Sequence, residues 1–414
     1  MKNNILEELK WRGLIKQVTN ESKILDAQNN SDAVYCGFDP TADSLHVGHL
    51  MMIITLKRFA DFNFKPIALI GGATGMIGDP SFKASERVLQ TKDQVDHNIK
   101  KISEQLKEII PTVSFVNNNT WLANISLIDF LRDIGKHFNL SYLLAKESIA
   151  TRIQTGLSVT EFCYTMLQAY DFYHLYKNNN CSIQIGGSDQ WGNITSGIDF
   201  ISDTINKNNK AAGLTINLLT KSDGQKFGKT ESGAVWLDKN KTSEYEFYQF
   251  WFNQTDQDCI NLLKCLTFLT KDQIDQLVKE HEKEPYKHFL QKALASEMTQ
   301  FVHKKQGLEK ALKLTDAFFS GDLFSLTDDL FQMALNSLPN TQISKETKVI
   351  DALIQLKAAS SKREAREFLT NKAIMINNQI IEDENILISD FKLIENKYLL
   401  VKKGKKKYFV ILVK

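Results

Sequence analysis

The chain has 414 residues, of which 43% are hydrophobic and 24% are charged. This composition is typical of a globular protein with two or three domains, and it excludes intrinsic disorder. No run of about 18 apolar residues occurs, so we expect no membrane-spanning helix. The five cysteines are scattered and form no CxxC pair, which predicts a cytoplasmic protein with reduced thiols and no structural metal.

The net charge of +2 is distributed unevenly along the chain. Residues 345–414 contain 15 Lys and Arg against 9 Asp and Glu, a balance of +6, whereas the remainder contains 36 against 40, a balance of −4. A basic C-terminal segment on a slightly acidic body predicts a polyanionic partner for that segment.

The first predicted elements are a helical stretch at 1–32 and a strand at 33–36. The strand is followed by a turn at 39–41 and by a helix that we expect from Leu45 onward. A strand, a tight loop and a helix N-terminus present free backbone N–H groups where an anion can bind. This part of the chain is therefore the first candidate for a phosphate site.

The predicted helix carries the sequence HVGH at residues 46–49. His46 and His49 are three residues apart and would share one face, while Gly48 leaves room for a flat base against the backbone. Two imidazoles and the Thr41 hydroxyl suit a polyphosphate that gains charge during a reaction. An exposed histidine pair is the alternative; a zinc site would lack a completing carboxylate or cysteine.

A second predicted strand, at 66–70, leads into the sequence GGATGMIGDP. Strand, helix and strand at this spacing indicate a βαβ unit of a parallel sheet. GGATG matches neither the dinucleotide pattern GxGxxG nor a Walker loop, which argues against hydride transfer and P-loop chemistry. The glycines would let backbone approach a ligand, and Asp79 ends this loop. The following Lys83 and Arg87, by themselves, fit a solvated polar face.

Residues 88–150 are predicted to form a series of helices with one short strand among them, at 113–116. The next helix, at 160–176, is mostly apolar but carries Tyr164, Gln168 and Asp171 on one face. Such a stripe is either a buried hydrogen-bond network or a pocket wall, and we favour the wall. A strand at 182–185 then ends in GGSDQWGN, where ligands bind in open parallel sheets.

The C-terminal half begins with a predicted strand at 216–219 and a loop containing KFGKT, residues 226–230. This loop is either a solvated turn or one that closes over phosphates. Helices at 243–251 and 256–320 follow, then a polar connector at 321–347. The end of the chain has a basic helix (SSKREAREFL), a strand pair around 377–378, and a hairpin whose lysine-rich tip at 402–407 either solubilises a turn or contacts RNA phosphates.

HVGH and KFGKT together resemble the two signatures of class I aminoacyl-tRNA synthetases, His-Ile-Gly-His and Lys-Met-Ser-Lys-Ser. The resemblance to the bacterial tyrosyl-tRNA synthetases covers essentially the whole chain. Val47 replaces isoleucine, and KFGKT changes three letters but keeps both lysines. The alternatives are a tryptophanyl-tRNA synthetase, an adenylyltransferase acting on a small cofactor precursor, and an inactive RNA-binding relative.

The resemblance implies an α/β fold with a Rossmann-like parallel-sheet catalytic domain at 1–240, including a dimer-forming connecting segment at about 115–150. It further implies an α-helical domain at 241–325, a connector at 326–347, and a small α+β RNA-binding domain at 348–414 like that of a ribosomal small-subunit protein. The expected partners are tRNA(Tyr), L-tyrosine, ATP with Mg²⁺, and a second copy of the chain.

The implied reaction is formation of tyrosyl-adenylate, followed by transfer of tyrosine to tRNA. The residues implied for catalysis are Thr41, His46, His49, Lys83, Arg87, Lys226, Lys229 and Thr230. The residues implied for tyrosine binding are Tyr35, Asp39, Asp79, Tyr164, Gln168, Asp171 and Gln190. The residues implied for ATP or adenylate binding are Cys36, Gly37, His46, Gly48, His49, Gly187, Asp189 and Lys229. The residues implied for tRNA binding are Lys362, Arg363, Arg366, Lys402, Lys403, Lys405, Lys406 and Lys407.

Overall fold

The computed structural model describes residues 4–81, 90–153, 156–219, 227, 229–230, 233–320, 322–404 and 407–414. The chain divides into two compact units. The first comprises Met1–Asp238 and Thr255–Leu290, and the second comprises Lys239–Gln254 and Gln291–Lys414. No helix among the described residues has the length and apolarity needed to cross a membrane.

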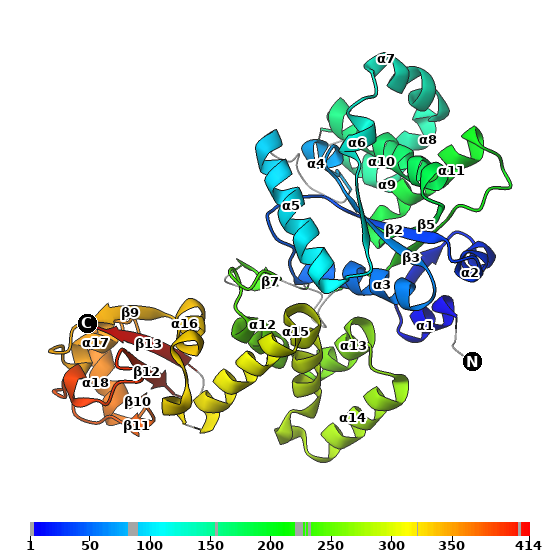
Figure 1. Cartoon of the computed structure of the whole chain (residues 1–414). Coiled ribbons are helices and arrows are strands. Elements are labelled where there is room, and N and C mark those ends of the chain that lie inside the picture. The colour runs from blue at the N-terminus through cyan, green and yellow to red at the C-terminus, as the bar shows by residue number, and fades with distance from the viewer. Residues whose placement is uncertain are drawn as a thin grey trace. The chain divides into compact units, whose positions relative to one another are not determined.

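The first unit is built around a sheet flanked by helices (Figure 1). Its strands are β1 (Ile15–Val18), β2 (Ala33–Phe38), β3 (Lys65–Ile70), β4 (Ser114–Asn117), β5 (Cys181–Gly187) and β6 (Ala212–Ile216), with a small ribbon of β7 (Lys229–Thr230) and β8 (Gly233–Ala234). Its principal helices are α1 (Ile5–Trp11), α2 (Glu21–Asn29), α3 (Leu50–Asp61), α4 (Thr74–Ile77), α5 (Lys92–Ile109), α6 (Asn119–Leu122), α7 (Leu127–Asp129), α8 (Leu140–Leu144), α9 (Glu147–Ile153), α10 (Val159–Asn178), α11 (Trp191–Thr204), α13 (Asp256–Leu266) and α14 (Lys271–Lys283).

The strand order of the main sheet is β1-β6-β5-β2-β3-β4, and all neighbours are parallel except β1 and β6. The order reverses between β5 and β2, where chain connections leave in opposite directions, so a crevice opens at their carboxyl ends. One face of the sheet packs against α10 and α11 through a buried apolar cluster that includes Tyr35 and Phe172. Helix α3 packs against β2, β3 and β5. The expected α/β class is confirmed.

Two details differ from the expected elements. The predicted helical stretch at 1–32 contains β1, an edge strand antiparallel to β6. The strand predicted at 216–219 is instead Ala212–Ile216, because the run AGLTI is fully buried whereas Leu218 is 54% exposed. Length and apolarity alone do not distinguish which end of such a run enters the sheet.

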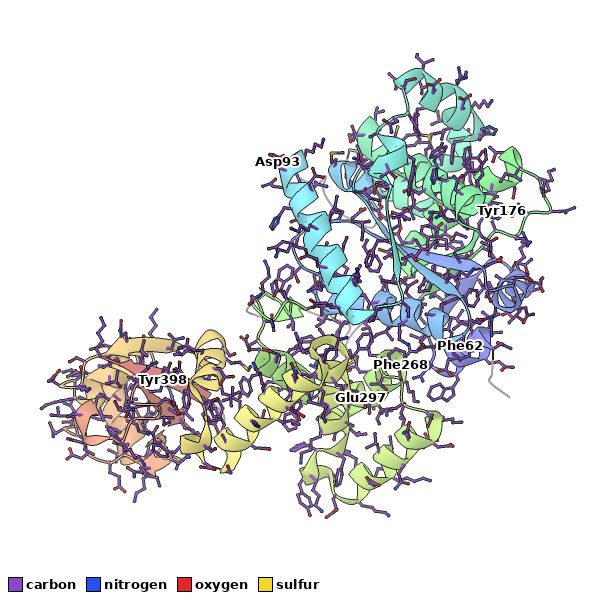
Figure 2. The ribbon with its side chains drawn as sticks, in the orientation of Figure 1. Phe62, Asp93, Tyr176, Phe268, Glu297 and Tyr398 are labelled. Atoms are coloured by element: carbon purple, nitrogen blue, oxygen red, sulfur yellow. The ribbon has the colours of Figure 1, made fainter. Side chains whose placement is uncertain are left out.

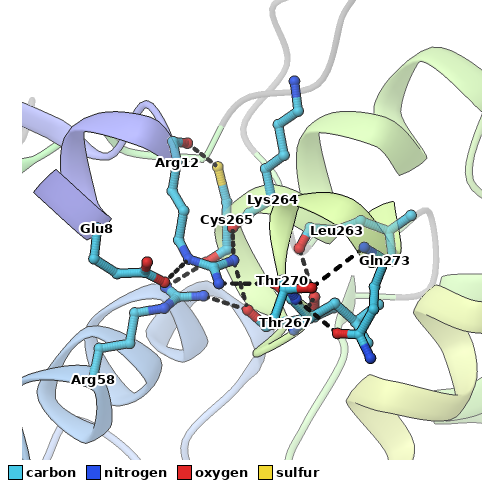
Figure 3. Close-up of polar contacts among 10 residues, drawn as sticks. Glu8, Arg12, Arg58, Leu263, Lys264, Cys265, Thr267, Thr270 and Gln273 are labelled. Carbon is cyan, nitrogen blue, oxygen red and sulfur yellow. Dashed lines mark hydrogen bonds and ion pairs between the residues drawn. The ribbon is translucent and has the colours of Figure 1, made fainter. Parts of the chain in front are cut away.

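Two buried arginines attach α13 to the first unit (Figure 3). Arg12 donates to the backbone oxygens of residues 264, 267 and 269, and Arg58 donates to those of residues 265 and 267. These carbonyls lie at or beyond the C-terminus of α13, where backbone acceptors lack intrahelical partners and the helix dipole favours cations. The expected helical domain at 241–325 is thus divided between the two units, with residues 255–290 in the first.

The second unit consists of α12 (Glu244–Phe252), α15 (Phe289–Ser320, whose first two residues belong to the first unit), α16 (Asp328–Ser337), α17 (Val349–Gln355) and α18 (Lys362–Thr370), with a five-stranded sheet. Its strands are β9 (Asn340–Ile343), β10 (Ile374–Ile376), β11 (Gln379–Ile380), β12 (Tyr398–Lys403) and β13 (Lys407–Val413), in the order β11-β10-β12-β13-β9. One face packs against α17 and α18, and the other against α16 and the end of α15.

The range expected as a connector, 326–347, contains α16 and β9. β9 pairs in parallel with β13, and the Phe331 ring of α16 stacks on Tyr398 with centroids 4.9 Å apart. The hydroxyl of Tyr398, a residue labelled in Figure 2, donates to Asp328 at 2.7 Å and accepts from Gln332 at 2.7 Å. Only one side of α16 is buried, so polar residues occupy the rest of the helix. The apolar residues of this range therefore show only a weak helical spacing in the sequence.

Candidate active site

A cavity of about 330 Å³ lies at the carboxyl ends of β2 and β5. Its size is that of a pocket for a small ligand. His46 and Gly48, among the described residues, do not line it. The predicted site residues that line it are Tyr35, Cys36, Gly37, Asp39, Thr41, His49, Asp79, Tyr164, Gln168, Asp171, Gly187, Asp189 and Gln190.

One end of the cavity presents two buried polar groups, the hydroxyl of Tyr35 and the carboxyl of Asp171. The Tyr35 hydroxyl has no hydrogen-bond partner among the described residues. Burial, and then the charge of Asp171, raise the pKa of Tyr35, so this hydroxyl keeps its proton at neutral pH. A buried donor without a partner is costly and indicates a ligand group at this end.

The Asp171 carboxyl is held by two side chains from α6 and the residue before it. Trp121 donates its indole N–H to Oδ1 at 2.7 Å, and Asn118 donates its amide to Oδ2 at 2.9 Å. Burial raises the pKa of Asp171 to about 7, against the opposing effect of these two hydrogen bonds. Each carboxylate oxygen retains acceptor capacity for a further donor.

The other end of the cavity carries carboxylates and amides. The Tyr164 hydroxyl donates to Asp39 Oδ2 at 3.0 Å, so its own lone pairs remain available as acceptors. Gln190 donates to Asp79 Oδ2 at 2.7 Å, and Gln168 donates to the Gln190 oxygen at 3.3 Å. An acceptor-rich group of this kind suits a small cationic group such as an ammonium.

The HVGH sequence forms a 3-10 turn (Val47–His49) that leads into α3, with His46 at the N-cap. The helix expected from Leu45 therefore begins two residues later. His46 Nδ1 accepts from the Gly48 N–H at 3.0 Å, and His49 Nδ1 accepts from the His46 N–H at 3.2 Å. Both rings thus carry their proton on Nε2, where it can be donated to an anion. A Cβ on Gly48 would approach His46 Cε1 to 2.7 Å, so any other residue would displace the His46 ring.

The charge state of His49 follows from its surroundings. Burial, and then the neighbouring His46, lower the pKa of His49 to about 3, so the ring is a neutral donor at physiological pH. Burial and Asp189 raise the pKa of the Cys36 thiol to about 12, so this thiol is not a nucleophile here. The described residues contain no cluster of His, Cys, Asp and Glu that could hold a metal ion.

Proteins of known family match this chain over its full length. A family model described as "tRNA synthetases class I (W and Y)" matches residues 27–320, and one described as "Tyrosine--tRNA ligase SYY-like C-terminal domain" matches residues 329–411. A tyrosine–tRNA ligase of Mycoplasma mycoides subsp. mycoides is 90% identical over 414 residues, the full length of both chains.

The chain belongs to the class I tyrosyl-tRNA synthetases. The tyrosine–tRNA ligase of Staphylococcus haemolyticus is 50% identical over 418 aligned positions, covering 99% of both chains. Among solved structures, a C-terminally truncated Aspergillus nidulans mitochondrial tyrosyl-tRNA synthetase superposes with a TM-score of 0.69 at 28% identity, over 77% of this chain and 94% of that chain. The resemblance inferred from HVGH and KFGKT is confirmed.

Some residues predicted for this synthetase fall outside the described part of the chain. Lys83, Arg87, Lys226, Lys405 and Lys406 lie in segments that the structure does not describe. The backbones of Lys229 and Thr230 form β7, which pairs with β8. Their roles, like those of the other site residues, stay predictions.

Four of the basic residues predicted for tRNA contact other groups of the C-terminal domain. Lys362 pairs with Asp351 at 2.7 Å, and Arg366 pairs with Glu384 at 2.6 Å. Lys403 donates to the Ala358 carbonyl and lies 3.8 Å from the centroid of the Phe368 ring. Lys402 lies over the Tyr408 ring. Arg363 and Lys407 are exposed.

Sequence reasoning missed several polar residues that line or support the cavity: Thr74, Ser81, Gln184, Asn118, Trp121 and Asn193. Gln184 is paired in register with Tyr35 on the neighbouring strand, and its Oε1 has no partner among the described residues. The sequence does contain a signal for Gln184 as a cavity residue, because it is a carboxamide in the middle of an apolar strand. Asn118 lies in the run NNNT, where nothing local separates a buried amide from a turn.

Proposed function

We propose that this tyrosine–tRNA ligase reads the phenol of tyrosine with Tyr35 and Asp171. The observation that carries the proposal is the buried, unpartnered Tyr35 hydroxyl beside the Asp171 carboxyl in the cavity. A phenol placed there would accept from Tyr35 and donate to Asp171, which satisfies both groups. Phenylalanine would leave both unpaired in a buried site, at a cost of roughly 1–3 kcal/mol each. Selection of tyrosine over phenylalanine through a buried hydroxyl site is general knowledge for tyrosyl-tRNA synthetases.

The acceptor-rich end is proposed to bind the ammonium group of tyrosine, through Asp79, Tyr164 and Gln168, with Asp39 and Gln190 beside them. This directs the tyrosine carboxylate toward Gly37, Gly187 and Asp189, which we propose contact the adenylate. The tyrosine carboxylate oxygen attacks the α-phosphorus of ATP, the bond from that phosphorus to the bridging oxygen breaks, and pyrophosphate leaves. No base is required, because the attacking carboxylate is already ionised.

Stabilisation of the charge that develops on the phosphates is assigned to the signature residues. His46 and His49 would donate from Nε2, and Thr41, Lys83, Arg87, Lys226, Lys229 and Thr230 complete the set. Donors held in place before the reaction act on the transition state without reorganisation. Mg²⁺ would enter bound to the ATP phosphates, since the described residues offer it no cluster of acidic ligands.

The second step transfers tyrosine from the adenylate to the terminal ribose of tRNA(Tyr), releasing AMP. The C-terminal domain is proposed to hold the tRNA. Its ion pairs Lys362–Asp351 and Arg366–Glu384 are solvent-exposed and contribute little, so phosphate can replace the carboxylates at small cost. Arg363 and Lys407 are proposed as further phosphate contacts.

The connecting segment is proposed to join two copies of the chain. Exposed apolar side chains gather in this segment and at the start of α10: Leu127, Ile128, Leu131, Leu140, Tyr142, Leu144 and Val159, with Val159 78% exposed. Apolar area of this kind on a folded protein marks an association surface. We propose that the enzyme works in the cytoplasm, in keeping with its five free cysteines.

Amino-acid-dependent exchange of pyrophosphate into ATP, run with all twenty amino acids, tests the proposed site. Tyrosine should support exchange with the highest kcat/KM, and phenylalanine should be weaker by orders of magnitude. Exchange of similar efficiency with tyrosine and phenylalanine in the wild-type chain would contradict the assignment of Tyr35 and Asp171.

A further inference from the structure

A buried asparagine outside the cavity connects the polar residues at its acceptor-rich end. Asn193 lies in the first turn of α11, and its side chain is 3% exposed. Its Nδ2 lies 3.0 Å from Gln168 Oε1, 3.3 Å from Gln190 Oε1 and 3.5 Å from Ser81 Oγ. Its Oδ1 accepts from the Thr165 hydroxyl at 3.0 Å. One amide therefore contacts four side chains from three segments of the chain.

This arrangement gives each carboxamide one orientation. The Asp79 carboxylate can only accept, so the Gln190 amide nitrogen faces it, at 2.7 Å, and the Gln190 oxygen faces Asn193. The amide hydrogens of Asn193 then point to the two glutamines, and Thr165 donates to its Oδ1. Gln168 therefore also turns its carbonyl oxygen toward Asn193. A carboxamide has a donor end and an acceptor end, so reversing one of them would place donors against donors.

We propose that Asn193 and Thr165 are positioning residues of the ammonium subsite. They do not line the cavity; they fix which way the amides of Gln168 and Gln190 face and, through Gln190, they orient the Asp79 carboxylate that an ammonium group needs. An ammonium has three donors and no acceptor, so a reversed Gln168 amide would repel it. The proposal rests on the proposed ammonium site and adds to it the residues that fix its hydrogen-bond polarity.

The test compares two ligands of the full-length protein that differ in one group. L-Tyrosine carries the ammonium, and 3-(4-hydroxyphenyl)propanoate is tyrosine without it. In Asn193→Ala and in the nearly isosteric Thr165→Val, the dissociation constant of tyrosine should rise about ten-fold, in the range expected for loss of a buried hydrogen bond to a charged site. The dissociation constant of the propanoate should change less than about two-fold.

A matched control is Ser196→Ala. Ser196 is also buried on α11, but its hydroxyl accepts from Lys146 rather than from the cavity residues. This variant should leave the ratio of the two dissociation constants as in the wild type. Thermal unfolding midpoints establish that each variant is folded, and Thr165→Val provides the answer if alanine at position 193 unfolds the chain.

Three results would overturn different statements. If Tyr164→Phe changes the ratio of the two dissociation constants but neither Asn193→Ala nor Thr165→Val does, the positioning role is wrong and the ammonium site stands. If Tyr164→Phe does not change the ratio either, the ammonium site itself is wrong. An equal loss of affinity for both ligands in Asn193→Ala and Thr165→Val would mean that these residues support only the packing of α10 on α11.

Discussion

The indole nitrogen of Trp121 donates a hydrogen bond of 2.7 Å to Oδ1 of Asp171. The Trp121 ring itself stacks on His174, with centroids 4.2 Å apart and an interplanar angle of 12°. His174 lies one turn after Asp171 on α10, so the same helix fixes both the plane of the indole and the carboxyl that it contacts. The orientation of the proposed phenol acceptor is thus set by a residue from a different part of the chain.

Trp121→Phe should weaken tyrosine use relative to phenylalanine. The ring can keep its stack on His174, but the hydrogen bond to Asp171 is lost. We expect the ratio of kcat/KM for tyrosine to that for phenylalanine to fall about ten-fold, as for loss of one hydrogen bond to a charged group. Phenylalanine activation by the same variant is the internal control. A ratio equal to that of the wild type would mean that Trp121 does not orient the acceptor.

The selectivity should depend on pH through Asp171. Burial raises the pKa of Asp171 in the free protein to about 7, so the carboxyl is protonated below this pH and ionised above it. An ionised carboxylate accepts a phenolic hydrogen bond more strongly than a protonated one. The tyrosine-to-phenylalanine ratio of kcat/KM should therefore rise with pH through about 7 and then level off. A flat ratio from pH 5.5 to pH 8.5 would contradict this titration.

The Trp121→Phe variant should shift the midpoint of the pH profile of this ratio. The hydrogen bond from Trp121 lowers the pKa of Asp171, and its removal should raise that pKa further. The midpoint of the pH profile should then lie above that of the wild type. The kcat/KM for phenylalanine measured over the same pH range corrects for titrations elsewhere in the protein. A midpoint that stays in place would show that the two groups do not interact as their distance suggests.

Tyr35→Phe should lower the selectivity for tyrosine without lowering the stability of the protein. The Tyr35 hydroxyl is buried and has no partner among the described residues, so its removal should leave the free energy of unfolding unchanged or raise it by about 1 kcal/mol. Tyrosine activation should nevertheless fall relative to phenylalanine. Chemical denaturation and pyrophosphate exchange measure the two effects. A destabilised protein with unchanged selectivity would identify Tyr35 as a packing residue only.

His46→Asn and His49→Gln should slow adenylate formation more than they weaken substrate binding. Removal of a preorganised donor to the transition state typically costs about ten- to a thousand-fold in rate. Single-turnover measurements separate the rate from the dissociation constants of tyrosine and ATP. Because the pKa of His49 is about 3, its contribution should be constant between pH 6 and pH 9. A loss confined to the dissociation constants would make these histidines ground-state binders.

The tRNA contribution of the C-terminal domain is best tested by removing charges. A truncation near Ser344 would leave β9 without β13 and expose the apolar sides of α15 and α16. Arg363→Gln with Lys407→Gln avoids this, and Lys100→Gln with Lys101→Gln on α5 is the matched control. The first pair should raise KM for tRNA and reduce the salt dependence of that KM. A separate measurement of pyrophosphate exchange reports on adenylate formation. Equal effects of both pairs would show a nonspecific charge effect.

The sequence by itself determined which polar side chains lie in and just after the central strands. Tyr35 lies in one central strand, Asp39 and the HVGH residues come after it, and Asp189 and Gln190 come after another strand, so their positions depend on local chain geometry. The stripe of Tyr164, Gln168 and Asp171 is fixed in the same way by the period of one helix. Both kinds of signal are short in range, which is why they are visible without the fold.

The tertiary structure decided everything that depends on partners distant in sequence. Trp121 and Asn118 reach Asp171 across 50 and 53 positions, and Asn193 meets Gln168 across 25. The edge strand β1 exists because β6, almost 200 residues later, offers it backbone partners. α13 is held in the first unit by Arg12 and Arg58, whose contacts with the end of this helix go to backbone oxygens. Backbone acceptors are the same in every residue, so no side-chain pattern could have predicted those contacts.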